Sequence, residues 1–130
     1  GQPEINIGFI PPIATTQAPA RLIGRPRAMR YLYEGGLVPA PEALNWGLLD
    51  ELVQPAGLRA YVQGYAEALV AKSPAALAAI RRTVTLGGGM TFEDGMAYEL
   101  KTVVELAGTA DFVEGVDAFL AKRQPKWKTP

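Results

Sequence analysis

The 130-residue chain contains neither cysteine nor histidine. Without histidine it can form no Ser-His-Asp or Cys-His nucleophile system. Without both residue types it can form no zinc finger, iron–sulfur cluster or disulfide. Any catalysis must therefore come from carboxylates, tyrosine, lysine, hydroxyl groups or backbone N–H groups. The missing cysteine leaves the redox compartment undetermined.

An excess of charge and a long apolar run are also missing. The 13 basic side chains balance the 13 acidic ones, which gives no indication of a nucleic-acid partner. No wholly apolar run is long enough to cross a membrane. The first residues show no methionine, basic n-region or apolar h-region, so we expect no signal peptide and a chain that continues from earlier sequence. With 48% hydrophobic residues, the composition is typical of a soluble globular domain, or part of one.

Helical patterns dominate what is present. The clearest is an apolar stripe at helical spacing from Leu58 to Val70. Ser73 and Pro74 predict the start of an alanine-rich helix that ends at residues 87–89. Further helices are predicted over 14–23, 26–34, 41–46, from a cap at Thr91 with Asp94 to 107, and from a cap at Asp111 with Glu114. Pro19 suits only the first turn of a helix, so the first of these is expected to be short, late-starting or kinked.

Two short segments read as strands, and the C-terminus reads as a tail. Residues 5–10 alternate only partly between apolar and polar, which indicates a buried strand or an extended turn, and residues 48–53 form a short apolar segment typical of a strand. Two isolated strands cannot form a stable sheet, so either they join a sheet supplied by other sequence or the strand prediction is wrong. Residues 124–130 are polar with two prolines, and we expect them to be loosely held.

Three sequence features could carry chemistry. Glu4 precedes an apolar segment, where a carboxyl group could serve as an acid or base, although its spacing alone favours a solvated turn. The glycines at 87–89 could cradle a phosphate, but they lack the lysine of a P-loop and favour a helix connector. Four cations surround Trp127 and indicate either a nucleotide contact or a solvated tail after a helix end: Lys122, Arg123, Lys126 and Lys128.

The opening segment Gly-Gln-Pro-Glu-Ile-Asn-Ile-Gly-Phe-Ile-Pro resembles the stretch of the crotonase (enoyl-CoA hydratase/isomerase) superfamily that carries one of two catalytic glutamates. The likeness covers nearly the whole chain, and its specific feature is the order and spacing of the motifs. It continues through residues 16–17, 21–24, 40–48, 72–74 and 114–123.

This resemblance implies an α/β crotonase-like fold with a spiral ββα core. The chain would be its mostly helical C-terminal portion, with one or two short strands. Residues 1–57 would end the core and carry the acid/base glutamate, and residues 58–130 would form a helical region for trimerisation and for covering coenzyme A. The other half would supply most of the sheet, both oxyanion-hole N–H donors and the second glutamate.

The same resemblance assigns site residues and partners. Glu4 would be the catalytic carboxylate, Pro12 would lie beside the substrate, and Phe119 and Lys122 would contact the adenine and phosphates of coenzyme A. It implies an acyl-CoA substrate, with coenzyme A as part of that substrate, no tightly bound cofactor and no metal. It also implies a cytoplasmic homotrimer or hexamer without nucleic-acid or membrane partners.

The chain departs from the family pattern directly after Ile10-Pro11. Family members usually continue with Gly-Ala-Gly-Gly-Thr-Gln, whereas residues 12–17 here read Pro-Ile-Ala-Thr-Thr-Gln. Pro12 therefore stands where a glycine N–H often faces the water or the acyl group, and proline has no N–H. A hydratase, an isomerase, lyase or dehalogenase of the same fold, and a catalytically silent scaffold or oligomerisation fragment all stay open.

Overall fold

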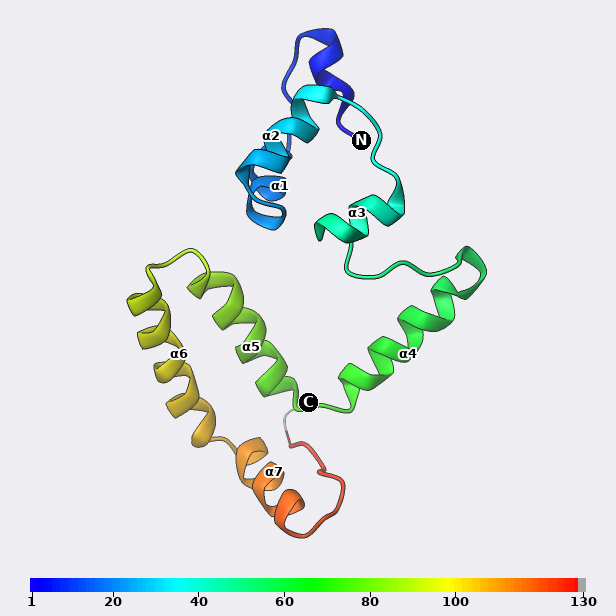
Figure 1. Ribbon diagram of the computed structural model, residues 1–130. Coiled ribbons are helices and arrows are strands. Elements are labelled where there is room, and N and C mark those ends of the chain that lie inside the picture. The colour runs from blue at the N-terminus through cyan, green and yellow to red at the C-terminus, as the bar shows by residue number, and fades with distance from the viewer. Residues whose placement is uncertain (129–130) are drawn as a thin grey trace. The chain divides into compact units, whose positions relative to one another are not determined.

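The computed structural model describes residues 1–128, which form helices joined by loops, with no strand in this part of the chain (Figure 1). The helical elements are η1 (Pro3–Ile7), α1 (Gln17–Leu22), α2 (Arg25–Glu34), α3 (Ala40–Trp46), η2 (Pro55–Gly57), α4 (Leu58–Val70), α5 (Pro74–Gly87), α6 (Phe92–Ala107) and α7 (Ala110–Leu120). The chain divides into two compact units, residues 1–58 and 59–130.

The first unit is built around α2, which packs against η1 and α1. Proline in the first turn of α2 suits its start, because proline's fixed φ is already helical and its missing N–H would be unbonded there. The helix ends at Gly35, whose φ of 59° lies in the left-handed region. A Cβ at this glycine would lie 2.5 Å from Ile5 Cγ2, so only glycine allows η1 to approach α2 here.

Both predicted strands are wrong. Residues 3–7 form the 3-10 turn η1, closed by Gly8 at φ 72° with its N–H donating to the Ile5 carbonyl at 3.1 Å. Residues 48–53 form no regular element. A strand needs a neighbouring strand to bond its backbone, and none is present in the described residues. Local turn bonds satisfy the backbone of η1 instead.

In the second unit, α5 and α6 form an antiparallel hairpin (Figure 1). The predicted caps are confirmed: Ser73 Oγ accepts from the N–H of Ala76 at 3.1 Å, and Thr91 Oγ1 accepts from that of Asp94 at 3.2 Å. Gly87 and Gly95 meet where the two helices cross, since a Cβ added to Gly95 would lie 3.4 Å from the carbonyl oxygen of Gly87. The helix predicted over 58–70 is also confirmed.

Two helices begin at residues other than the first ones predicted for them. The N-cap of α7 is Thr109, which accepts from the N–H of Phe112 at 3.2 Å, and Asp111 lies in the first turn. The Asp111 carboxylate is instead bonded to Ser73 and Lys128, so a neighbouring residue caps the helix. The helix expected over 14–23 begins at Gln17 and is short, which is the late start that Pro19 in its first turn predicted, and Ala14 before it has a φ of 62°.

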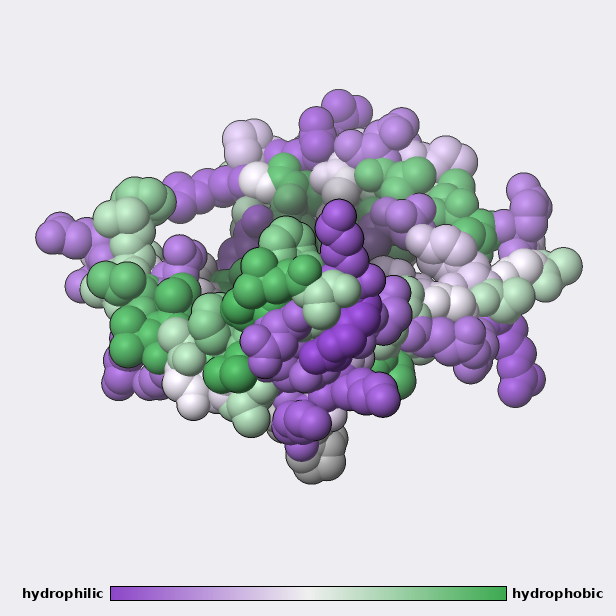
Figure 2. Space-filling view, turned by 90° about the horizontal axis from the view of Figure 1, so that it is seen from below, coloured by the Kyte–Doolittle hydropathy of each residue, from purple (hydrophilic) through white to green (hydrophobic). Residues whose placement is uncertain are grey.

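Neither unit contains a core of large side chains. No large side chain in the described residues is fully buried. Apart from Pro11 and Pro19, the buried apolar side chains are Ile23, Ala28, Tyr31, Ala43, Ala79 and Ala118. Many large apolar side chains are exposed instead, and apolar surface lies beside hydrophilic surface on the face drawn in Figure 2. Exposed apolar area on this scale indicates surfaces that pack against further protein. Within residues 1–128, no helix combines the length and apolar character needed to cross a membrane.

Candidate functional site

Glu4 lies in the 3-10 turn η1, and its side chain is half-buried. The carboxylate oxygen Oε2 is buried and has no hydrogen-bond partner in the described residues. Buried carboxylate oxygens in folded proteins are almost always bonded, so an unbonded one indicates a partner outside the described residues, either elsewhere in the protein or in a bound molecule. At the position predicted from the sequence, this oxygen of Glu4 can therefore accept a further hydrogen bond. Its catalytic role stays a prediction at this point.

The loop between η1 and α1 is strained. Ile13 and Ala14 have φ values of 58° and 62°, which side chains with a Cβ rarely adopt. Pro11 is buried and Pro12 is exposed, and the Pro12 carbonyl accepts both from the N–H of Thr15 at 3.4 Å and from its hydroxyl. Ile13 is 94% exposed, so no packing within this chain offsets the strain.

Sequence reasoning named Pro12 in this loop and missed Ile13 and Ala14. The signal was present, because these residues replace part of a glycine-rich family pattern. Glycine adopts positive φ at little cost, and isoleucine does not. Backbone strain of this kind is concentrated at functional sites. Ile13 is thus an additional candidate beside Glu4 and Pro12.

The end of α7 carries the other two predicted residues. Phe119 is 82% exposed, and Lys122 is exposed with a φ of 50°. The N–H of Lys122 donates to the Phe119 carbonyl at 3.2 Å, and that of Arg123 to the Ala118 carbonyl at 3.0 Å. This is the bonding of a Schellman turn, in which the left-handed position is usually glycine. Here a lysine occupies it.

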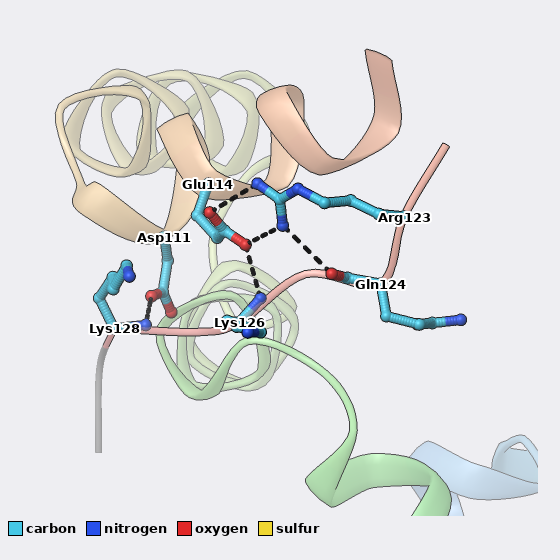
Figure 3. A network of polar contacts seen from close by, with 6 residues as sticks. All are labelled: Asp111, Glu114, Arg123, Gln124, Lys126 and Lys128. Atoms are coloured by element: carbon cyan, nitrogen blue, oxygen red, sulfur yellow. Dashed lines mark hydrogen bonds and ion pairs between the residues drawn. The ribbon is translucent and has the colours of Figure 1, made fainter. Parts of the chain in front are cut away.

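The segment 124–128, which we name the C-terminal strap, is fixed to the second unit (Figure 3). The N–H of Lys126 donates to Glu114 Oε1 and that of Lys128 to Asp111 Oδ1, each at 2.6 Å. Trp127 Nε1 donates to the Ala71 carbonyl at 2.9 Å. The prediction of a loosely held tail is therefore wrong as far as Lys128, because side chains far back in the chain bond it. Residues 129 and 130 lie outside the described residues.

Charge reinforces these contacts at Glu114. Arg123 places Nη1 2.6 Å from Oε1 and Nη2 3.1 Å from Oε2 of Glu114. The side chain of Arg123 and then the backbone N–H of Lys126 lower the pKa of Glu114 to about 2. The same hydrogen bond raises the pKa of Arg123. The pair is therefore charged over the whole range in which proteins normally fold.

A cavity of about 340 Å³ lies beside the strap in the second unit. Phe119 and Trp127 both line it, and its wall is almost entirely apolar. Its two buried polar side chains bond one another, with Ser73 Oγ donating to Asp111 Oδ2 at 2.6 Å. The remaining lining residues are Ala76, Leu106, Thr109, Phe112, Gly115, Val116 and Leu120.

The four predicted site residues fall into two groups. Glu4 and Pro12 belong to the first unit, and Phe119 and Lys122 to the second. Each group lies on a short stretch of strained or capped backbone. Within residues 1–128, no group of three or more carboxylates stands close enough together to hold a metal ion.

The comparisons with known proteins agree along the whole chain. The family model described as enoyl-CoA hydratase/isomerase matches residues 1–130. A probable enoyl-CoA hydratase of Rhizobium meliloti is 35% identical over 98% of this chain and 50% of its own length. A probable mitochondrial enoyl-CoA hydratase of Dictyostelium discoideum is 33% identical over 98% of this chain and 46% of its own length.

A solved structure also matches this chain. The chain is similar to an enoyl-CoA hydratase of Bacillus anthracis, with a TM-score of 0.93 and 29% identity over 97% of this chain and 49% of that one. The chain therefore spans about half the length of the relatives it matches.

Proposed function

Because the chain belongs to the enoyl-CoA hydratase/isomerase family, we propose that the protein containing it acts on an acyl-CoA thioester by carboxylate acid–base catalysis. The chain is the mostly helical C-terminal portion of a crotonase-like fold. The observation that carries the proposal is Glu4 Oε2, which is buried and unbonded within the described residues. A carboxylate in that state can exchange a proton with a bound substrate.

For a hydratase, water adds across the conjugated double bond of an enoyl thioester. The water oxygen bonds to C3 while one water proton passes to a carboxylate, and a proton is delivered to C2. Negative charge develops on the thioester oxygen, where fixed N–H dipoles stabilise it. In this proposal Glu4 is one of the two carboxylates. The other carboxylate and the oxyanion-hole donors come from the half of the protein outside this chain.

Pro12 favours a second candidate, an isomerase. Proline provides no N–H with which to hold a water molecule, whereas moving a double bond needs no water. In that reaction a carboxylate removes a proton from C2 of a 3-enoyl thioester and returns it to C4. The oxyanion hole and Glu4 serve both reactions, so the product distinguishes them.

Coenzyme A recognition is assigned to the end of α7. Phe119 offers an exposed aromatic face and Lys122 an exposed ammonium, which suit an adenine ring and a phosphate. We include in the proposal that no cofactor is tightly bound and that coenzyme A enters as part of the substrate. We assign no metal, nucleic-acid or membrane partner.

We further propose a cytoplasmic homotrimer or a hexamer of two trimers. The apolar stripe of α4 supports an assembly, since Leu58, Val62 and Tyr65 are 52%, 54% and 62% exposed. In this proposal the two ranges keep the roles expected from the sequence: residues 1–57 carry the catalytic glutamate, and residues 58–130 cover coenzyme A. Light scattering on the full-length protein tests the assembly, and a monomer would contradict it.

The test of the catalytic proposal uses the full-length protein with 2-enoyl-CoA and 3-enoyl-CoA substrates. Glu4→Gln is expected to lower kcat by a factor of about 10² to 10⁴, because amide replaces carboxyl at the proton-transfer site. Glu51→Gln is the control, since that residue is exposed in the same unit. Product analysis separates hydration from isomerisation. A wild-type protein that binds acyl-CoA but converts neither substrate would support the silent scaffold instead.

A further inference from the structure

One carboxylate holds the Lys122 turn and the strap together. Glu114 Oε1 accepts from Arg123 Nη1 and from the N–H of Lys126, both at 2.6 Å (Figure 3). Arg123 directly follows Lys122, and Lys126 is the middle residue of the strap. Glu114 is also the more enclosed partner, since its side chain is 12% exposed against 44% for Arg123. It therefore fixes the backbone on the C-terminal side of Lys122.

The Lys122 turn needs such support. A residue with a Cβ is less stable at a φ of 50° than in ordinary helical or extended backbone. The hydrogen bonds from Lys122 and Arg123 to the end of α7 favour the turn, but glycine would form them with less strain. The lysine thus sits where its backbone is unfavourable and its ammonium is exposed. The direction in which the Lys122 side chain points depends on the contacts that hold the turn.

We propose that Glu114 is a positioning residue that keeps Lys122 in the geometry for contacting a phosphate of coenzyme A. The inference rests on the proposed function, because it takes Lys122 as a coenzyme A contact. Glu114 itself touches no ligand. It acts through the backbone of the turn, which it fixes by way of Arg123 and Lys126.

The other anchors of the strap make this a local effect. Lys128 is bonded to Asp111, and Trp127 to the Ala71 carbonyl, independently of Glu114. Trp127 also packs on Gly115, where an added Cβ would lie 3.4 Å from its ring. Weakening Glu114 should therefore loosen the turn around Lys122 and leave the far end of the strap in place.

The experiment uses the full-length protein carrying Glu114→Gln. Glutamine keeps the shape and one carbonyl oxygen for the N–H of Lys126, but it has no charge for Arg123. Calorimetry measures the Kd for coenzyme A, and steady-state kinetics measure KM and kcat for an enoyl-CoA. We expect Kd and KM to rise about three- to tenfold, because a charge-assisted contact is misplaced rather than removed. The effect should fall on KM and not on kcat, as for a uniform binding contact.

Two further variants test the same contact from the other side and provide a control. Arg123→Gln breaks the same pair from the other side and should raise Kd by a similar factor. Glu105→Gln is the matched control, because its ion pair with Arg82, at 3.4 Å, is exposed and lies on the α5–α6 hairpin. Its Kd should stay within about twofold of wild type.

A double variant separates positioning from a general structural role. If Glu114 acts through Lys122, then Lys122→Ala combined with Glu114→Gln should bind coenzyme A no more weakly than Lys122→Ala alone. The emission that is lost on Trp127→Phe, measured with and without Glu114→Gln, isolates the signal of Trp127 from any other tryptophan and reports whether the strap stays docked. We expect its emission to be unchanged by Glu114→Gln.

The outcomes are distinguishable. Additive losses in the double variant, or a red-shifted Trp127 emission, would show a general structural role and overturn the inference. So would a wild-type Kd in Glu114→Gln. If that variant does not fold, Arg123→Gln decides, and a wild-type Kd there overturns the inference equally. A wild-type protein that does not bind coenzyme A at all would instead overturn the proposed function.

Discussion

Replacing Lys122 by glycine should make the protein more stable and a weaker binder of coenzyme A. Lys122 occupies the left-handed position of the turn after α7, with a φ of 50°. Glycine has no Cβ and adopts that φ without strain. The same change removes the exposed ammonium that we assign to a phosphate. Stability and binding should therefore move in opposite directions.

The magnitude follows from two opposing contributions. Relief of left-handed strain stabilises the folded state by about 1–2 kcal/mol. The extra freedom of glycine in the unfolded chain costs about 0.4–1 kcal/mol. The net gain is about 0.8 kcal/mol at the middle of these ranges, which corresponds to a rise in Tm of about 2–3 °C for a domain of roughly 150–250 residues. Loss of the phosphate contact should raise Kd for coenzyme A about tenfold.

The assay pairs Lys122→Gly with Lys122→Ala in the full-length protein. Alanine also removes the charge but keeps a Cβ, so it should raise Kd equally and leave the strain in place. Scanning calorimetry gives Tm, and titration with coenzyme A gives Kd. Equal Tm changes in both variants would refute the backbone argument. An unchanged Kd in both would refute the assignment of Lys122 to coenzyme A.

Three further predictions concern strain, packing and pH. Ile13→Gly should stabilise the full-length protein by about 0.5–1 kcal/mol in thermal unfolding, because it relieves a φ of 58° at a side chain that is 94% exposed. A loss of stability would instead show that the rest of the protein packs on Ile13. Gly35→Ala should destabilise by about 1–3 kcal/mol in urea unfolding, since its Cβ would lie 2.5 Å from Ile5 Cγ2 at a φ of 59°, and a neutral result would contradict this packing. The pKa of Glu114 is lowered to about 2 from 4.5, so its stabilising effect is complete above pH 4.5 and is lost as pH falls through about 2. The stability difference between wild type and Glu114→Gln, measured by urea unfolding of the full-length protein, should shrink over that window; a constant difference would refute it.

Local patterns predicted the second unit well. The apolar stripe from Leu58, the Ser73 cap and the Thr91 cap all stand in the structure as expected. Each depends on residues within about one helical turn, where side-chain spacing and cap bonds decide the conformation. The cap predicted at Asp111 was wrong, because Thr109 lies nearby and Asp111 has partners elsewhere in the fold.

Less of the candidate site could be predicted from the sequence. Glu4 and Lys122 were identified through resemblance, but the positive φ at Lys122 and at Ile13 could not be read from residue type. Both residues normally avoid that conformation, so the local preference pointed away from it. The open oxygen of Glu4 also depends on what surrounds η1, which no spacing rule describes.

The sequence by itself determined most of the helices, the Ser73 and Thr91 caps and the family, because these depend on residue order and on contacts between near neighbours. Only the tertiary structure decided that residues 3–7 turn rather than extend and that the polar strap is fixed. A strand requires a partner strand, and the strap requires Asp111, Glu114 and the Ala71 carbonyl from well before it in the chain. Hydrogen bonds of that range are made by the fold, and local preference does not specify them.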